Sequence, residues 1–165
     1  ILAAMADEAR AHLKIFDENA VQATLLLFDD ENATSFICRA RARSSRPTGQ
    51  KVSCIDSIAY FWLQRFPDRA STVHDIRKQD AFPLRLSDGP EAGGYRSILS
   101  LPLVERADNS SVHRLRGVIT LDSKRRYEFW GARRQELEAL LEPHIRWIMA
   151  ITDNHPHIKQ IERRA

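Results

Sequence analysis

Apolar residues recur along this chain with two different periods, and these periods locate the helices and strands. A spacing of three or four residues, which is typical of helices that bury one face, occurs near both ends of the sequence. It predicts helices over residues 1–18 and 133–152. The same spacing predicts a third helix over residues 55–66, bounded by a proline at position 67.

Five shorter stretches are rich in Ile, Leu, Val and Thr and are bounded by polar residues, as the strands of a buried sheet are. They comprise residues 21–28, 34–43, 71–76, 95–104 and 115–123. A turn rich in Asp and Asn joins the first two stretches, which predicts a hairpin. The last two stretches are joined by a polar loop and predict adjacent antiparallel strands.

The strands carry apolar residues on both faces, so both faces of the sheet must be covered. We therefore predict an α/β fold of the α+β type, with a central antiparallel sheet of five or six strands and helices on both faces. The terminal helices are expected on one face. The 55–66 helix and the irregular stretch 77–94, which contains two Pro and three Gly, are expected on the other.

Length and composition fit one globular domain. The chain has 165 residues, of which 43% are hydrophobic and 28% charged. We assign residues 1–152 to the domain and residues 153–165 to a C-terminal tail or linker to a downstream region. No apolar run approaches the ~20 residues of a membrane span. The first residue is Ile1 and no signal-peptide pattern follows, so we expect a piece of a longer protein.

Cysteine usage and charge restrict the setting further. Two cysteines without a close motif fit a reducing compartment, which favours a cytoplasmic location. The net charge is +3 and the pI is about 9.1. Nucleic-acid binding would need the cations on one surface, and we expect no nucleic-acid partner. Alternation places Arg39, Arg41 and Arg43 on one side of a strand, where they either bind phosphate or, as we favour, protect a sheet edge.

Four segments in the second half of the chain carry a family resemblance. They are Val73–Ile76 (V-H-D-I), Tyr95–Leu103 (Y-R-S-I-L-S-L-P-L), Gly117–Ser123 (G-V-I-T-L-D-S) and Phe129 before the long helix. Together they resemble the GAF domain family, over residues 4–151, and the predicted architecture is GAF/PAS-like. The resemblance implies a non-catalytic sensory or regulatory domain of a larger bacterial signalling protein, with an adjacent output domain.

The resemblance also implies where a ligand would lie, between the sheet and residues 77–94. The residues expected to line that pocket are Phe36, Ile58, Asp75, Phe82, Tyr95 and Ser97. A bound small molecule would then act through the terminal helices, which we also expect to form a homodimer. The alternative is a ligand-free module for dimerisation or protein–protein interaction, with the same volume filled by Trp62, Phe66 and Phe82.

Candidate cofactor and catalytic groups are few. Some GAF domains attach a bilin to a cysteine beside a histidine, but Arg39 follows Cys38 and Ile55 follows Cys54. The free methionine sulfoxide reductase branch uses a set of reactive cysteines whose motif is missing here, and the Asn-Lys pair of cyclic-nucleotide sites is missing too. The histidines are scattered. We therefore expect no enzyme activity and no bilin, haem or metal.

Overall fold

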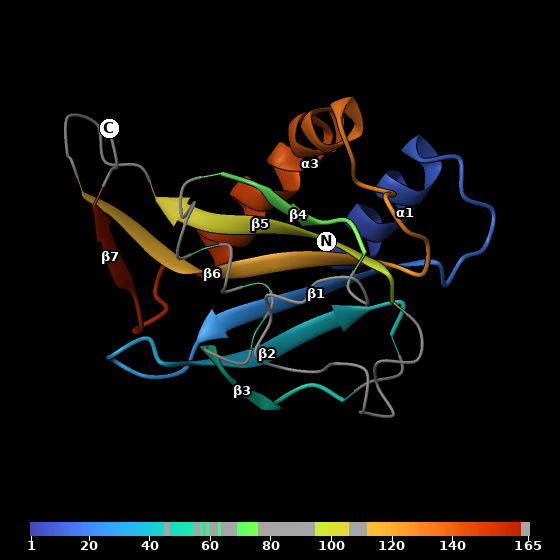
Figure 1. Ribbon diagram of the computed structural model, residues 1–165. Coiled ribbons are helices and arrows are strands. Elements are labelled where there is room, and N and C mark those ends of the chain that lie inside the picture. The colour runs from blue at the N-terminus through green and yellow to red at the C-terminus, as the bar shows by residue number, and fades with distance from the viewer. Residues whose placement is uncertain are drawn as a thin grey trace.

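The structure is a computed structural model that describes residues 1–44, 47–54, 57, 59, 63, 69–75, 95–105 and 112–162. The two long helices of this part are α1 (Leu2–His12) and α3 (Ala132–Ile151). The strands are β1 (Val21–Phe28), β2 (Ser35–Ala42), β3 (Lys51–Ser53), β4 (Ser71–Val73), β5 (Ser97–Glu105), β6 (Val112–Ser123) and β7 (Lys159–Glu162). Figure 1 shows the arrangement.

The strands form one antiparallel sheet in the order β3-β2-β1-β6-β5-β4, and β7 pairs with the first residues of β6. The predicted fold class is confirmed. β1 and β6 lie in the middle of the sheet, as their apolar sequences indicate, and β1 is buried along its whole length. The strands β3 and β7 were not predicted.

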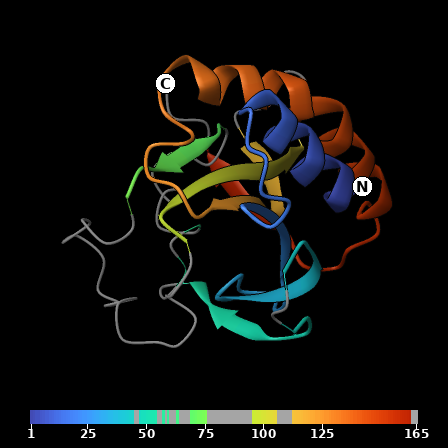
Figure 2. The ribbon, with the colours of Figure 1, turned by 90° about the vertical axis from the view of Figure 1, so that its right-hand side faces the viewer.

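Helices α1 and α3 lie side by side on one face of the sheet (Figure 2). Alternate residues of the strands point toward them, so Leu25, Leu99 and Ile119 share one apolar core with the helices. Met5 and Ala9 of α1 and Leu137 and Leu141 of α3 are fully buried in this core. The prediction that the terminal helices share one face is therefore confirmed.

A second, smaller core lies on the opposite face of the sheet. It contains Leu26, Phe28, Phe36, Cys38, Cys54, Ala59, Leu63, Leu115 and Val118, among others. Ala59 and Leu63 belong to the predicted 55–66 helix, and both are helical and buried. Most of that predicted helix, and the 77–94 connection, lie outside the described residues.

The chain turns back after α3. His155 Nε2 lies 2.7 Å from the Phe28 carbonyl oxygen at the end of β1, and β7 then pairs with β6. No helix in the described part of the chain is both long and apolar enough to cross a membrane.

A cluster of ion pairs around the buried Arg116 joins β6 to the end of α3. Arg116 is 2% exposed, and it sits where the β5–β6 register shifts. Its guanidinium donates to Glu105 at 2.9 Å, to Asp153 at 2.7 Å and to the Met149 carbonyl oxygen at 3.3 Å. The positions of β6 and of the last turn of α3 are thereby coupled.

Candidate functional site

Buried polar side chains cross the sheet on the face opposite α1 and α3. Pairing between neighbouring strands aligns Ser71 with Ser100, Ser100 with Thr120, and Thr120 with Thr24. In the next row, Asp122 pairs with Gln22. We call these six buried residues the polar floor: Gln22, Thr24, Ser71, Ser100, Thr120 and Asp122.

Alternation along the strands explains why these polar groups share one face. In β1, β5 and β6 they lie between residues that contribute to the core beneath α1 and α3, such as Leu25, Leu99 and Ile119. Each of these strands therefore has one apolar face and one face that carries both polar and apolar residues. Toward the far end of β1 the mixed face becomes apolar again, at Leu26 and Phe28.

Three atoms of the polar floor lack a hydrogen-bond partner in the part of the chain that the structure describes. They are Gln22 Oε1, Thr24 Oγ1 and Ser71 Oγ, all inaccessible to solvent. Leaving a buried polar group unpaired costs about 1–3 kcal/mol. Native proteins keep such groups for a reason, usually a water, an ion or a ligand that completes the bonds.

The polar floor opens at one end into a hollow. Its volume is about 710 Å³, which is within the range of about 300–1,000 Å³ usual for small-molecule sites. It is lined by Asn19, Gln22, Arg43, Ser44, Tyr95 and Lys124. Gln22 belongs to both the floor and the hollow, so the two form one continuous polar surface.

Tyr95 and Asp75 are two of the predicted site residues at this end of the sheet. Tyr95 is half-buried and lines the hollow. The Asp75 side chain is buried and its carboxylate accepts two hydrogen bonds from the neighbouring Arg96, at 3.1 and 2.9 Å. Arg126 approaches the same carboxylate at 3.6 Å. Asp75 thus anchors β4 to β5 through Arg96.

Ser97 lies at the same end of the sheet but on the face that Leu99 shares with the helices, and Phe36 lies elsewhere. Ser97 is fully buried, pairs with Ser123, and donates from Oγ to the Arg125 carbonyl oxygen at 2.7 Å. Phe36 stacks on Phe28, with ring centroids 4.8 Å apart. Phe28 and Gln22 are at opposite ends of β1, roughly 20 Å apart at the rise of a strand. Ile58 and Phe82 lie outside the described residues.

Sequence reasoning missed the polar floor itself. The signal was present, since Q-A-T in β1 and T-L-D in β6 place polar residues at alternate positions of otherwise apolar strands. A strand predicted to be buried on both faces should not carry such residues without partners. That conflict between burial and polarity could have identified Gln22, Thr24, Thr120 and Asp122.

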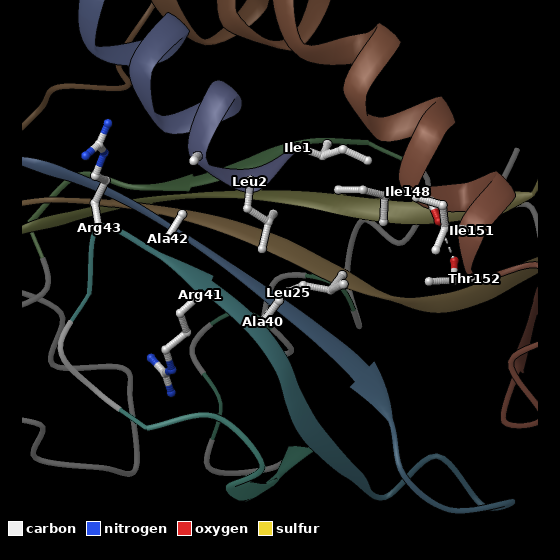
Figure 3. Close-up of a pocket in the computed structure, with 11 residues that line it drawn as sticks. Ile1, Leu2, Leu25, Ala40, Arg41, Ala42, Arg43, Ile148, Ile151 and Thr152 are labelled. Atoms are coloured by element: carbon white, nitrogen blue, oxygen red, sulfur yellow. Dashed lines mark hydrogen bonds between the residues drawn. The ribbon is translucent and has the colours of Figure 1, made fainter.

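Arg39 and Arg41 of β2 and Arg43 beyond its end do not form the predicted row. Figure 3 shows Arg41 pointing away from the helices and Arg43 pointing toward them. Arg43 lies just beyond β2 with φ 60°, and its guanidinium donates to Asp7 of α1 at 3.0 and 2.8 Å. Arg41 Nε donates to the Pro47 carbonyl oxygen at 3.1 Å.

The two cysteines are free and buried. Burial raises the pKa of the Cys54 thiol to about 12, and its Sγ–H donates to the Ala33 carbonyl oxygen at 3.5 Å. A thiol with this pKa stays protonated at neutral pH and is a poor nucleophile. Within the described ranges, no group of three His, Cys, Asp or Glu side chains is placed to hold a metal ion.

An apolar groove of about 510 Å³ lies on the helical side of the sheet (Figure 3). Ile1 and Leu2 of the α1 start face Ile148 and Ile151 of the α3 end across it, and Leu25 forms part of its base. Ile151 is 68% exposed. The groove is therefore an exposed apolar surface formed by the start of the first helix and the end of the last.

Comparison with solved structures identifies the fold as that of GAF domains. The GAF domain of an Acinetobacter phosphoenolpyruvate-protein phosphotransferase is 17% identical with a TM-score of 0.60, over 93% of this chain and 82% of that one. A protein described as a GAF sensor from Burkholderia vietnamiensis is 18% identical with a TM-score of 0.54, over 90% and 95%.

The same fold also occurs in an enzyme. A type II free methionine-R-sulfoxide reductase from Thermoplasma acidophilum is 12% identical with a TM-score of 0.51, over 89% of this chain and 96% of that one. No protein-family model and no curated protein matches the sequence. The resemblance to GAF domains is thus confirmed as a likeness of fold.

Proposed function

We propose that this chain is a non-catalytic sensory domain of a larger signalling protein, and that it binds a small polar molecule on the polar floor. The observation that carries the proposal is a set of three buried atoms that have no hydrogen-bond partner among the described residues, namely Gln22 Oε1, Thr24 Oγ1 and Ser71 Oγ. The likeness of fold to a described GAF sensor agrees with this role.

The chemistry of the floor defines the ligand in outline. Gln22 Oε1 needs a donor, whereas the Thr24 and Ser71 hydroxyls can donate or accept. The hollow adds Arg43 and Lys124 at its rim, each shared with an acid, Asp7 and Asp17. A small molecule rich in hydroxyl or amide groups satisfies these atoms. The 77–94 connection is the segment expected to cover it.

A route from the ligand to the helices passes through β6. This strand carries Thr120 and Asp122 of the floor, and it also carries Arg116, which contacts Met149 and Asp153 at the end of α3. A shift of β6 on binding would therefore change the contacts that hold the end of α3. We propose this coupling as the relay.

The absence of catalysis is part of the proposal. A reductase that uses cysteine needs an accessible thiolate. Cys38 and Cys54 are both buried, and burial raises the pKa of Cys54. These features favour a structural role for both thiols, in contrast to the reductases that share the fold.

Thr24→Val tests the proposal because it removes an unpartnered hydroxyl without changing side-chain shape. We expect the free domain to gain about 1 kcal/mol in unfolding free energy. Ligands found by thermal-shift screening of polar metabolites should bind at least about tenfold more weakly, which corresponds to the loss of one hydrogen bond in a buried site.

Thr152→Val is the matched control. Thr152 is also buried, but its Oγ1 donates to the Ile148 carbonyl oxygen at 2.8 Å. This variant should lose about 1 kcal/mol of stability and keep its ligand affinity. If no polar metabolite stabilises the wild-type domain, or if Thr24→Val leaves affinity unchanged, the proposed site is wrong.

A second candidate function is a ligand-free dimerisation module, and the exposed apolar side of α3 favours it. Leu140, Trp147 and Ile151 are 39%, 66% and 68% exposed and follow one another at spacings of seven and four residues. Such a spacing lines one side of a helix, and the apolar groove lies beside its end.

A further inference from the structure

Three exposed aromatic side chains lie at the end of the molecule where α1 ends and α3 begins. Phe16, in the loop after α1, is 92% exposed, while Trp130 and Tyr127, in the loop before α3, are 60% and 40% exposed. These two loops meet at the same end of the sheet (Figure 1). Large apolar side chains that remain in water indicate a surface that binds a partner.

Contacts between the loops fix this end. Lys124 donates from its backbone N–H to the Ala20 carbonyl oxygen at 3.2 Å. His12, at the end of α1, places Nε2 at 2.9 Å from the Glu136 carboxylate in the first turns of α3. The aromatic residues are therefore held together by the fold and do not depend on one flexible loop.

Tyr127 and Trp130 form a cluster with His74. The Tyr127 ring stacks on His74 with centroids 6.1 Å apart, and Trp130 lies 5.4 Å from His74 and 5.5 Å from Tyr127. Tyr127 has φ 54°, which is rare for a bulky residue, and its N–H donates to the His74 carbonyl oxygen at 2.8 Å. The cluster is thus held in a specific, strained backbone conformation.

Basic residues surround the cluster, and most of the nearby acids are neutralised. Lys124, Arg125 and Arg126 precede Tyr127, and all three are exposed. Glu128 is buried against Arg133 at 3.3 Å.

The remaining acids leave the positive charge in excess. Asp75 is buried between Arg96 and Arg126, and Asp17 is 3.9 Å from Lys124. The pKa of Arg43 is raised chiefly by its hydrogen bond to Asp7, and the negative charge of Glu18 raises it further. Among the described residues, the Arg125 guanidinium has no ion-pair partner. This end therefore presents exposed aromatic rings beside three consecutive exposed cations, Lys124, Arg125 and Arg126.

We propose that this aromatic–basic end, made of Phe16, Lys124, Arg125, Arg126, Tyr127 and Trp130, docks on an anionic lipid membrane. A membrane surface combines negative headgroups for the cations with an interfacial region that favours Trp and Tyr rings. Phe16, which has no polar atom, gains by entering that region. This surface shares Lys124 with the rim of the hollow, whereas its aromatic residues and Arg125 do not line the hollow.

A single-stranded nucleic acid fits these features less well. Its bases bind by stacking on free aromatic faces in succession along a groove. One face of Tyr127 is already covered by His74, and Phe16 belongs to a different loop. A lipid surface requires only that exposed side chains lie at one end of the molecule, and the two loops that carry these residues meet at the same end of the sheet.

Sedimentation with vesicles tests the proposal. The chain should bind vesicles of phosphatidylcholine mixed equally with phosphatidylserine, bind pure phosphatidylcholine vesicles weakly, and be released by high salt. Arg125→Gln should weaken binding about fivefold, since one basic residue near an anionic surface contributes about that factor. The double variant Phe16→Ser/Trp130→Ser should weaken it by more than about tenfold.

Trp147→Ser is the matched control. Trp147 is 66% exposed and Trp130 60%, but Trp147 lies near the other end of α3. The Trp147→Ser variant should bind vesicles as tightly as the wild type does. Circular dichroism checks that each variant is folded.

A second measurement does not depend on weakened binding. Lipids brominated in the acyl chains should quench tryptophan fluorescence in the wild type and in Trp147→Phe, but only weakly in Trp130→Phe. Equal binding to neutral and anionic vesicles, unchanged quenching in Trp130→Phe, or tighter binding to a single-stranded oligonucleotide than to vesicles would each overturn the proposal.

Discussion

Asp75 shows how a polar residue next to a predicted pocket can have a structural role. Its position after a short strand made it a candidate for ligand binding. Its carboxylate instead faces the Arg96 guanidinium in a two-bond ion pair, with Arg126 as a second cation. The neighbouring Tyr95 lines the polar hollow. The role of a polar residue at the edge of the sheet therefore depends on partners from another strand.

Sequence alone could identify Tyr95 because it precedes a strand at the open end of the sheet. It could not identify Ser71 or Ser100, since only the β4–β5 register places them in line with Thr120 and Thr24. Phe36 was correctly assigned to the face opposite the terminal helices, but it belongs to the apolar core there. The choice between core and site is made by cross-strand neighbours.

Cys54 gives a pH dependence that belongs to the residue scale. Burial raises the pKa of its thiol from the ordinary 9.0 to about 12. Between these values the folded state retains a proton that the unfolded state has lost, so stability is complete below about pH 9 and falls as the pH rises. The slope should reach about 1.4 kcal/mol per pH unit at most.

Urea unfolding at several alkaline pH values measures this dependence. The variant Cys54→Ala provides the comparison, because the other titrating groups are unchanged in it. The difference in unfolding free energy between wild type and variant should shrink as the pH rises above about 9. If that difference stayed constant with pH, the pKa of the Cys54 thiol would not be raised in the folded protein.

At the scale of elements, the helices and the central strands follow from the sequence because their apolar periods are long and regular. The strands β3 and β7 do not. β3 has three residues and β7 has the largely polar sequence K-Q-I-E. Both are added at positions where a longer strand already offers unpaired backbone groups, so their structure is set by that neighbour and not by their own pattern.

Gly117 carries a prediction about the pairing of β1 with β6. A Cβ added there would lie 2.1 Å from the Leu26 carbonyl oxygen and 2.9 Å from the Leu27 Cα, which are backbone atoms of the adjacent strand. Relief would require the strands to separate. We expect Gly117→Ala to lower the unfolding free energy by about 3 kcal/mol, measured by urea denaturation.

Gln135→Ala serves as the control for this substitution. Gln135 is exposed on α3, and alanine is favourable within a helix. Its stability should remain within about 0.5 kcal/mol of the wild type. If Gly117→Ala were equally mild, the close approach of β1 and β6 would be incorrect.

At the scale of the whole molecule, the layer arrangement was predictable because both faces of the strands are apolar and demand cover. The strand order was implied only where strands are adjacent in sequence, as in the β1–β2 and β5–β6 pairs. The central β1–β6 pair joins distant parts of the chain, and periodicity carries no information about such a partner.

The exposed side of α3 carries a prediction about assembly. If the domain dimerises through its terminal helices, Trp147 and Ile151 become buried, and Ile151→Glu should raise the dimer dissociation constant by more than about tenfold. Analytical ultracentrifugation over a range of concentrations measures this. Gln135→Glu, an exposed position at the opposite end of α3, is the control. A wild type that stays monomeric at high concentration would contradict the homodimer.

The pairing of β1 with β6 also has a consequence for folding kinetics. The β1–β2 hairpin can form as soon as its turn closes. The β1–β6 pair, which aligns Val21 with Ser123, can form only after two segments that are distant in the sequence have come together. Closing so long a loop is slow relative to local contacts. During that interval the most apolar strand of the domain has one unpaired edge, so β1 is the segment through which partly folded chains would associate.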